Sequence, residues 1–309
     1  RKQFLDVLRV LATCAVVLMH VLTGATDVTD ASIMPEYRSL LLSVMDLVTW
    51  CVPIFLLISG YLFLNPERTL TYPVMIKKYC RRIALAILLF GVPYAASELV
   101  VAERTFRIRM IPEALKMTLT GHTWSHMWYL YLILFLYLIT PLLKKVLRVL
   151  PVWGVAAVMA VIFLGSSVAP FLNKVLDVNS IPVLPDGGVY FLYYLCGYFF
   201  AVREVGVDKG RNVWLTAAVA VLALGMILSR TLAGFSIQMA YNYPFTVLLA
   251  VLLFAAGWNG SIKKHRIPWQ EAGALSFAVY LVHPVYVNLL YKFVKITPFT
   301  VLEQCGVQS

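Results

Sequence analysis

Charged residues are scarce in this chain of 309 residues, where Asp, Glu, Lys and Arg together make up 13% of positions. Hydrophobic residues make up 61%, and the mean hydropathy is +0.81. Soluble domains usually carry about 25% charged residues, so this composition excludes an ordinary water-soluble enzyme or binding module. The sequence instead predicts a protein that crosses a membrane several times.

The sequence also lacks the patterns that mark several common kinds of site. Its five cysteines show no Cys-x-x-Cys and no Cys/His spacing, so we expect neither a disulfide framework nor a zinc site. It contains no glycine-rich phosphate loop, no low-complexity tract and no convincing internal repeat. We therefore expect one domain over residues 1–309 and no bound metal.

Long apolar stretches recur along the whole chain. Each must be helical to cross a hydrocarbon core, because its backbone amides and carbonyls find no water there. The expected fold is all-α, a polytopic bundle of transmembrane helices. Nine spans are expected, at residues 4–24, 40–63, 80–101, 127–143, 152–171, 188–202, 213–230, 241–258 and 273–293.

Lysine and arginine are divided unevenly between the two sets of loops that join these spans. With the N-terminus in the cytoplasm, the cytoplasmic loops hold 17 of the 26 basic residues, which favours that orientation. Nine spans then place the C-terminus outside, and we expect a tenth helix in the complete protein. The same bias accounts for the net charge of +11 without a nucleic-acid partner.

Ionisable residues inside apolar spans are informative, because such a group at mid-bilayer costs about 3 kcal/mol unless it meets a partner or water. Arg9 and His20 share one face of the first span, with a rise of about 16 Å between them. Asp6 lies near that face and is placed to pair with Arg9. Asp46 in the second span and His283 in the last are expected near the depth of His20.

These residues also have structural explanations. An intramembrane histidine such as His283 can bond a carbonyl and hold helices together, and Asp46 can serve as a helix–helix hydrogen bond. The geometric pairing with Arg9 favours a functional role for His20. The basic stretch KKYCRR at residues 77–82 suits lipid headgroups or a phosphate-bearing ligand.

Five segments, taken in order, resemble the membrane acyltransferase 3 family. The stretch FLDVLRVLATCAVVLMH, residues 4–20, is similar to the Arg-x10-His signature of the family's first helix. The other four segments are VPIFLLISGYLF (52–63), HMWYLYLILFLYLITPLL (126–143), YFLYYLCGYFF (190–200) and LSFAVYLVHP (275–284). After the second helix, the family usually has an arginine, two residues and a second arginine. At that place this chain departs from the pattern and has Tyr79 with Arg82, or Lys78 with Arg81.

The resemblance implies an O-acyltransferase, commonly an O-acetyltransferase, in the bacterial inner membrane. Its partners would be acetyl-CoA or another acyl-CoA as donor, a cell-surface glycan or lipid-linked saccharide as acceptor, and the surrounding lipids. His20 would act as general base or carry the acyl group itself. The other expected catalytic residues are Asp46 and His283. The expected coenzyme-binding residues are Arg9, Lys77, Lys78, Arg81 and Arg82, and the expected substrate-binding residues are Ser59, Tyr129 and His126.

A proton-coupled transporter is the competing interpretation, in which His20, Asp46 and His283 form a proton relay. The lack of an inverted repeat and of paired broken helices counts against it. A purely structural scaffold would leave three buried ionisable groups without a purpose. The acceptor, the acyl chain and the oligomeric state stay open at this point.

Overall fold

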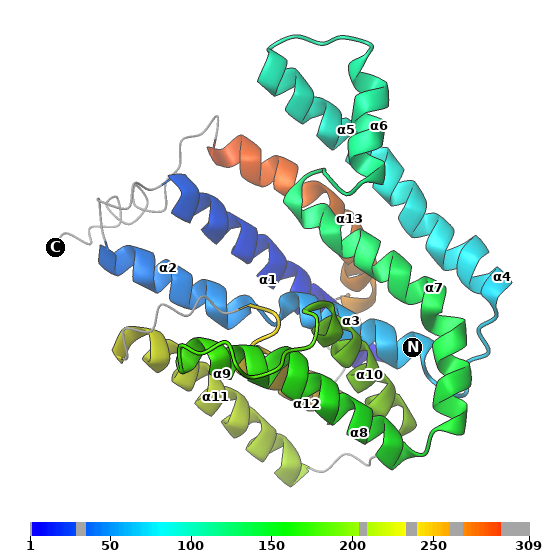
Figure 1. Ribbon diagram of the computed structural model, residues 1–309, viewed down its shortest axis with the longest axis vertical. Helices are drawn as coiled ribbons and strands as arrows, with labels where there is room; N and C mark the ends of the chain where they lie inside the picture. The colour runs from blue at the N-terminus through cyan, green and yellow to red at the C-terminus, as the bar shows by residue number, and fades with distance from the viewer. Residues whose placement is uncertain (1, 29–34, 204–208, 233–239, 260–267, 292–309) are drawn as a thin grey trace. The chain divides into compact units, whose positions relative to one another are not determined.

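The computed structural model describes residues 2–28, 35–203, 209–232, 240–259 and 268–291, and within these ranges its regular structure consists of helices without any strand (Figure 1). The expected all-α class is therefore confirmed. The chain divides into two compact units: unit 1 comprises Arg1–Leu62 and Ala156–Ser309, and unit 2 comprises Phe63–Val155. The single domain expected over residues 1–309 stays a prediction.

Helices make up most of both units. Unit 1 contains α1 (Gln3–Val28), α2 (Pro35–Val48), α3 (Cys51–Phe63), most of α8 (Val152–Phe163), the π-helix η3 (Leu164–Val168), α9 (Ala169–Val175), α10 (Gly187–Val202), α11 (Lys209–Leu232), α12 (Pro244–Asn259) and α13 (Trp269–Leu289). Unit 2 contains α4 (Tyr72–Val74), the π-helix η1 (Met75–Cys80), α5 (Arg81–Glu103), α6 (Met110–Leu119), the 3-10 helix η2 (Ser125–Met127) and α7 (Trp128–Val149).

Apolar helices occupy all nine of the expected membrane ranges. Among the described residues, six segments are long and apolar enough to cross a membrane: Gln3–Gly24, Leu40–Phe63, Tyr72–Glu103, Ser125–Val149, Val152–Val175 and Trp269–Leu289. Three shorter apolar helices fill the other ranges, at Gly187–Val202, Val213–Met226 and Pro244–Asn259. The number of crossings and the cytoplasmic N-terminus stay predictions, and the expected tenth helix lies outside the described residues.

The helices α1 and α13 pack side by side in unit 1 and run in the same direction (Figure 1). Gly273 near the start of α13 lies against Asp6, where a Cβ atom would be 3.1 Å from the carboxylate Oδ1. Beyond the end of α13, the Tyr291 hydroxyl donates to the carbonyl of Val21 at 2.6 Å. Two membrane helices that run in the same direction must be separated in the chain by an odd number of membrane crossings. The seven spans expected between α1 and α13 satisfy this condition.

A second close contact in unit 1 joins α3 and α10 through glycines. A Cβ atom at Gly60 would lie 1.9 Å from the carbonyl oxygen of Tyr194, and one at Gly197 would lie 2.2 Å from that of Leu57. No side chain fits at such distances, so glycine is what lets the two backbones touch. Packing therefore explains the glycines of the Ser-Gly and Cys-Gly sequences in these helices.

The second expected span, residues 40–63, is interrupted. The helix α2 ends at Val48, a turn covers Thr49 and Trp50, and α3 begins at Cys51. Pro53 provides the physical reason, because in a continuous helix its ring would clash with the carbonyl of Thr49. The expected span at residues 40–63 is therefore present as an apolar segment, Leu40–Phe63, made of two helices joined by a turn.

In unit 2, α5 and α6 form a helical hairpin, and α7 packs against η1 and α5 (Figure 1). Gly91 of α5 admits Thr118 of α6, whose methyl carbon would lie 2.7 Å from a Cβ atom at that position. The hydroxyl of Tyr131 in α7 donates to the carbonyl of Thr118 at 2.5 Å. Unit 2 is therefore held by its own contacts.

Candidate functional site

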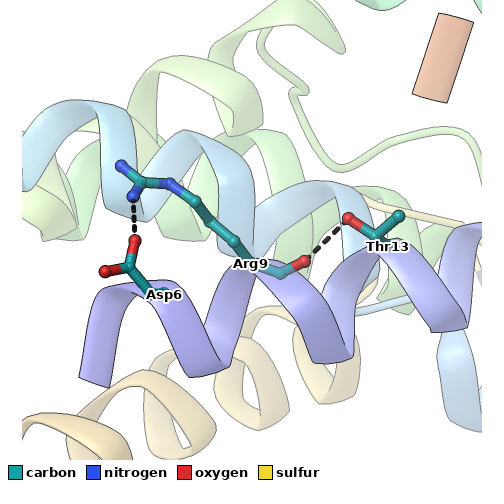
Figure 2. Close-up of polar contacts among 3 residues, drawn as sticks. All are labelled: Asp6, Arg9 and Thr13. Carbon is teal, nitrogen blue, oxygen red and sulfur yellow. Dashed lines mark hydrogen bonds and ion pairs between the residues drawn. The ribbon is translucent and has the colours of Figure 1, made fainter. Parts of the chain in front are cut away.

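Arg9 and Asp6 form an ion pair near the start of α1, as Figure 2 shows. The Arg9 Nη1 atom donates to Oδ1 of Asp6 at 2.8 Å, and the Asp6 side chain is buried. The Thr13 hydroxyl donates to the carbonyl of Arg9 at 2.8 Å, one turn further along (Figure 2). The pairing expected from the three-residue spacing is confirmed, and it holds the guanidinium in one orientation because a charge-assisted hydrogen bond is both short and directional.

His20 and His283 meet where α1 packs on α13. Their ring centroids lie 4.9 Å apart, and the ring planes are tilted by 51°. The Nδ1 atom of His283 lies 2.8 Å from the carbonyl oxygen of Tyr280 and 3.1 Å from that of Val279. Because these carbonyls accept, a neutral His283 carries its proton on Nδ1 and presents Nε2 as a hydrogen-bond acceptor. The carbonyl contact foreseen for His283 is therefore present, together with a contact to His20.

Asp46 is buried in the last turn of α2, directly before the interruption of this span. The Thr49 backbone N–H donates to the Asp46 carbonyl at 3.3 Å, and the Thr49 hydroxyl donates to the Met45 carbonyl at 2.9 Å. Ser43 and Thr49 are also buried, so polar residues recur every third position on one face of this segment. The helix α2 packs against α1, and the role of Asp46 as a partner of His20 stays a prediction.

One tyrosine contacts the histidine pair and a second contacts Met19 beside it, and neither was expected from the sequence. The Tyr280 ring centroid lies 6.0 Å from that of His283. The Tyr241 hydroxyl donates to the sulfur of Met19, the neighbour of His20 in the chain, at 3.8 Å. The Tyr193 hydroxyl in turn donates to the Tyr241 carbonyl at 2.7 Å. In the sequence, the signal that could have identified these tyrosines was a polar hydroxyl group within an apolar stretch.

The expected coenzyme-binding residues fall in both units. Arg9 belongs to unit 1. The other four are exposed and follow one another along a single helical segment of unit 2, with Lys77 and Lys78 in η1 and Arg81 and Arg82 at the start of α5. A π-helical turn widens the backbone and is frequent at functional sites. Phosphate binding by these residues stays a prediction.

The expected substrate-binding residues are divided in the same way. Ser59 is buried in α3 of unit 1, next to Gly60. His126 is buried in η2 of unit 2, and its ring centroid lies 5.6 Å from that of Tyr94. Tyr129 is half-buried in α7, edge-to-face with the neighbouring Trp128. Their roles toward a substrate stay predictions.

The sequence model of the acyltransferase 3 family, described as an acyltransferase domain, matches residues 2–306. The chain belongs to the acyltransferase 3 family. No curated protein and no solved structure matches it. Membership makes the protein a membrane acyltransferase, as the resemblance of its motifs indicated, and its apolar helices agree with a multi-pass membrane protein.

Two of the motifs that carry the family resemblance come together in unit 1. The first-helix motif provides His20 and the motif of α13 provides His283, and their rings are in contact. The glycine motifs of α3 and α10 pack against each other. Within the described residues of this acyltransferase, no group of three or more His, Cys, Asp or Glu side chains is arranged to hold a metal ion.

Proposed function

We propose that the protein transfers an acyl group, in the simplest case acetyl, from cytoplasmic acyl-CoA to a hydroxyl of a cell-envelope glycan or lipid-linked sugar. The bacterial inner membrane is the proposed location. The observation that carries this proposal is the contact between His20 and His283 inside the helix bundle of a family acyltransferase. Two imidazoles from distant parts of the chain, brought together within an apolar bundle, are suited to moving a proton.

In the proposed reaction, neutral His20 accepts the proton of the acceptor hydroxyl while the hydroxyl oxygen attacks the thioester carbonyl. The carbon–sulfur bond then breaks, and the departing thiolate of coenzyme A takes the proton from the imidazolium. Two imidazolium charges in such close rings repel each other, so the proposed reaction protonates one of the two rings at a time. A covalent acyl-histidine is the alternative route for the same transfer.

The remaining residues of unit 1 have supporting roles in this proposal. Asp46 orients His20 and stabilises the imidazolium that forms during transfer. Hydroxyl groups such as those of Tyr241 and Tyr280 donate to the developing oxyanion or hold the acceptor. Arg9, oriented by Asp6, binds an anionic group of the coenzyme at the cytoplasmic end of α1.

The test is transfer or hydrolysis of radiolabelled acetyl-CoA by the purified full chain. We expect the native protein to release or transfer the label and the His20→Ala variant to lose the activity. His122→Ala is the matched control, because His122 is an exposed histidine in unit 2 that contacts Thr120. Equal activity of the native protein and His20→Ala would remove His20 from the mechanism.

A proton-coupled transporter is the second candidate, and one observation favours it. The interruption at Thr49 and Trp50 directly follows buried Asp46, and discontinuous helices are where many transporters bind ions. Protein in liposomes with a pH-sensitive dye distinguishes the two functions. Proton entry that needs no acyl donor and is lost in Asp46→Asn would favour transport over acyl transfer.

A further inference from the structure

Arg68 lies in the segment between α3 and α4, and aromatic rings of unit 2 hold its guanidinium. An Nη2 group of Arg68 donates to the Tyr79 hydroxyl at 2.5 Å. The guanidinium carbon lies 5.1 Å from the ring centroid of Phe63 and 5.6 Å from that of Tyr79. The two rings themselves pack edge-to-face at 4.8 Å. The half-buried guanidinium is therefore held in one place by cation–π contacts and a hydrogen bond.

The backbone of Arg68 is held as well, by a buried lysine. Lys144 of α7 is 5% exposed, and its ammonium donates to the carbonyl oxygen of Arg68 at 2.7 Å and to that of Asn65. Burying an ammonium group is costly, and these two carbonyls offset the cost. Both ends of Arg68 are thus anchored, which lowers the entropy that would be lost when a ligand binds its guanidinium.

A second cation contacts the ring of Tyr79. The Lys78 ammonium lies 5.6 Å from the ring centroid of Tyr79, the ring that also contacts Arg68. Residues 63–97 contain five basic residues and one acidic residue, Glu67. Two like charges on one aromatic ring repel each other, and a bound anion relieves that repulsion. The planar fork of a guanidinium matches the oxygens of a phosphate group.

We infer that Arg68 binds a phosphate group, with Lys78 as the second cation at that phosphate. The identity of the ligand rests on the proposed function: the phosphate belongs to the nucleotide end of acyl-CoA. An anionic phospholipid headgroup offers the same chemistry, so the experiment tests both sources. Arg68 was not among the coenzyme-binding residues expected from the sequence.

The experiment measures the binding of acetyl-CoA to the purified full chain in detergent. Arg68→Ala should weaken binding about 10-fold or more, because a charge-assisted hydrogen bond is lost, and Arg68→Lys should recover part of the loss. Arg107→Ala is the matched control, since Arg107 is an exposed arginine of unit 2 that pairs with Glu103. Equal binding by Arg68→Ala and the native protein would overturn the coenzyme assignment.

Binding of a truncated donor shows whether Arg68→Ala loses a phosphate contact or loses structure in general. S-acetylpantetheine lacks the nucleotide phosphates, so the native protein and Arg68→Ala should bind it equally. Weaker binding of this probe by Arg68→Ala would show a structural role and would overturn the inference.

The lipid arm compares the binding of phosphatidylglycerol to the same variants. A loss confined to this lipid would support a phosphate site and assign it to a headgroup, and no loss with either ligand would overturn the inference. Native protein that fails to bind acetyl-CoA would contradict the proposed function, while the lipid arm would still test the phosphate site.

Discussion

Unit 1 and unit 2 place their polar residues in different ways. Unit 1 brings them together between helices, as in the contact of His20 with His283 and the packing of Gly273 on Asp6. In unit 2, cations lie exposed along one helical segment, and the guanidinium of Arg68 packs against aromatic rings. Groups enclosed between helices suit proton transfer, whereas displayed cations suit capture of an anion.

This difference has a kinetic consequence under the proposed function. Substitutions at the histidine pair of unit 1 should lower the rate of acyl transfer, whereas substitutions at the cations of unit 2 should weaken the binding of the donor. The two units are also stabilised differently, because backbones touch at glycines in unit 1 and a buried lysine donates to two backbone carbonyls in unit 2. Five substitutions, grouped in four predictions, test the comparison.

The largest effect is expected at the glycine contact of unit 1. A Cβ atom at Gly197 would lie 2.2 Å from the Leu57 carbonyl oxygen, and a backbone atom cannot move aside as a side chain can. Gly197→Val should therefore destabilise the protein by about 3 kcal/mol, measured as a lower Tm in detergent. Gly225→Ala is the control, because nothing lies within 4 Å of a Cβ atom there; a similar Tm for both variants would contradict the expectation.

The next effect separates chemistry from binding. His20→Ala should lower kcat for acyl transfer about 100-fold, the usual contribution of a general base, while the Kd for acetyl-CoA stays unchanged. Lys78→Ala should do the reverse, raising Kd with little change in kcat. A lower kcat together with a higher Kd in both variants would show that rate and donor binding are not separated between the two units.

A smaller effect is expected at the buried lysine of unit 2. Lys144→Met keeps most of the side-chain volume and leaves the carbonyls of Asn65 and Arg68 without their donor, at a cost of about 1–3 kcal/mol. Denaturation in detergent should show this loss, together with a higher Kd for acetyl-CoA. Lys145→Met is the matched control at the exposed neighbouring position. Equal stability of both variants would mean that Lys144 does not anchor this segment.

The smallest effect is expected at the ion pair of α1. Asp6→Asn removes the partner of Arg9, whose side chain is 22% exposed, so solvent screening limits the change to about 0.5–1 kcal/mol. We expect donor binding to weaken about 3-fold, in line with that energy. Glu103→Gln, which breaks a more exposed pair with Arg107, should leave it unchanged. A tenfold effect of Asp6→Asn would show that the carboxylate does more than orient Arg9.

The sequence by itself determined the features that depend on composition and on short-range helix geometry. Hydropathy placed the apolar helices, because length and apolarity are properties of one segment. The spacing of three residues was sufficient for the pair of Asp6 with Arg9, since neighbours on one helix are brought together by the helix itself. The interruption after Asp46 also had a local signal in Pro53, which the sequence analysis did not use.

Contacts between distant segments were decided by the tertiary structure alone. The sequence placed His20 and His283 at similar depths, but only the packing of α1 on α13 brought their rings together. Tyr79 stood out as a departure from the family pattern, and only the fold showed that its hydroxyl holds Arg68. The physical reason is that hydrophobic periodicity tells which face of a helix is buried, whereas the partner of that face depends on side-chain packing between segments far apart in the chain.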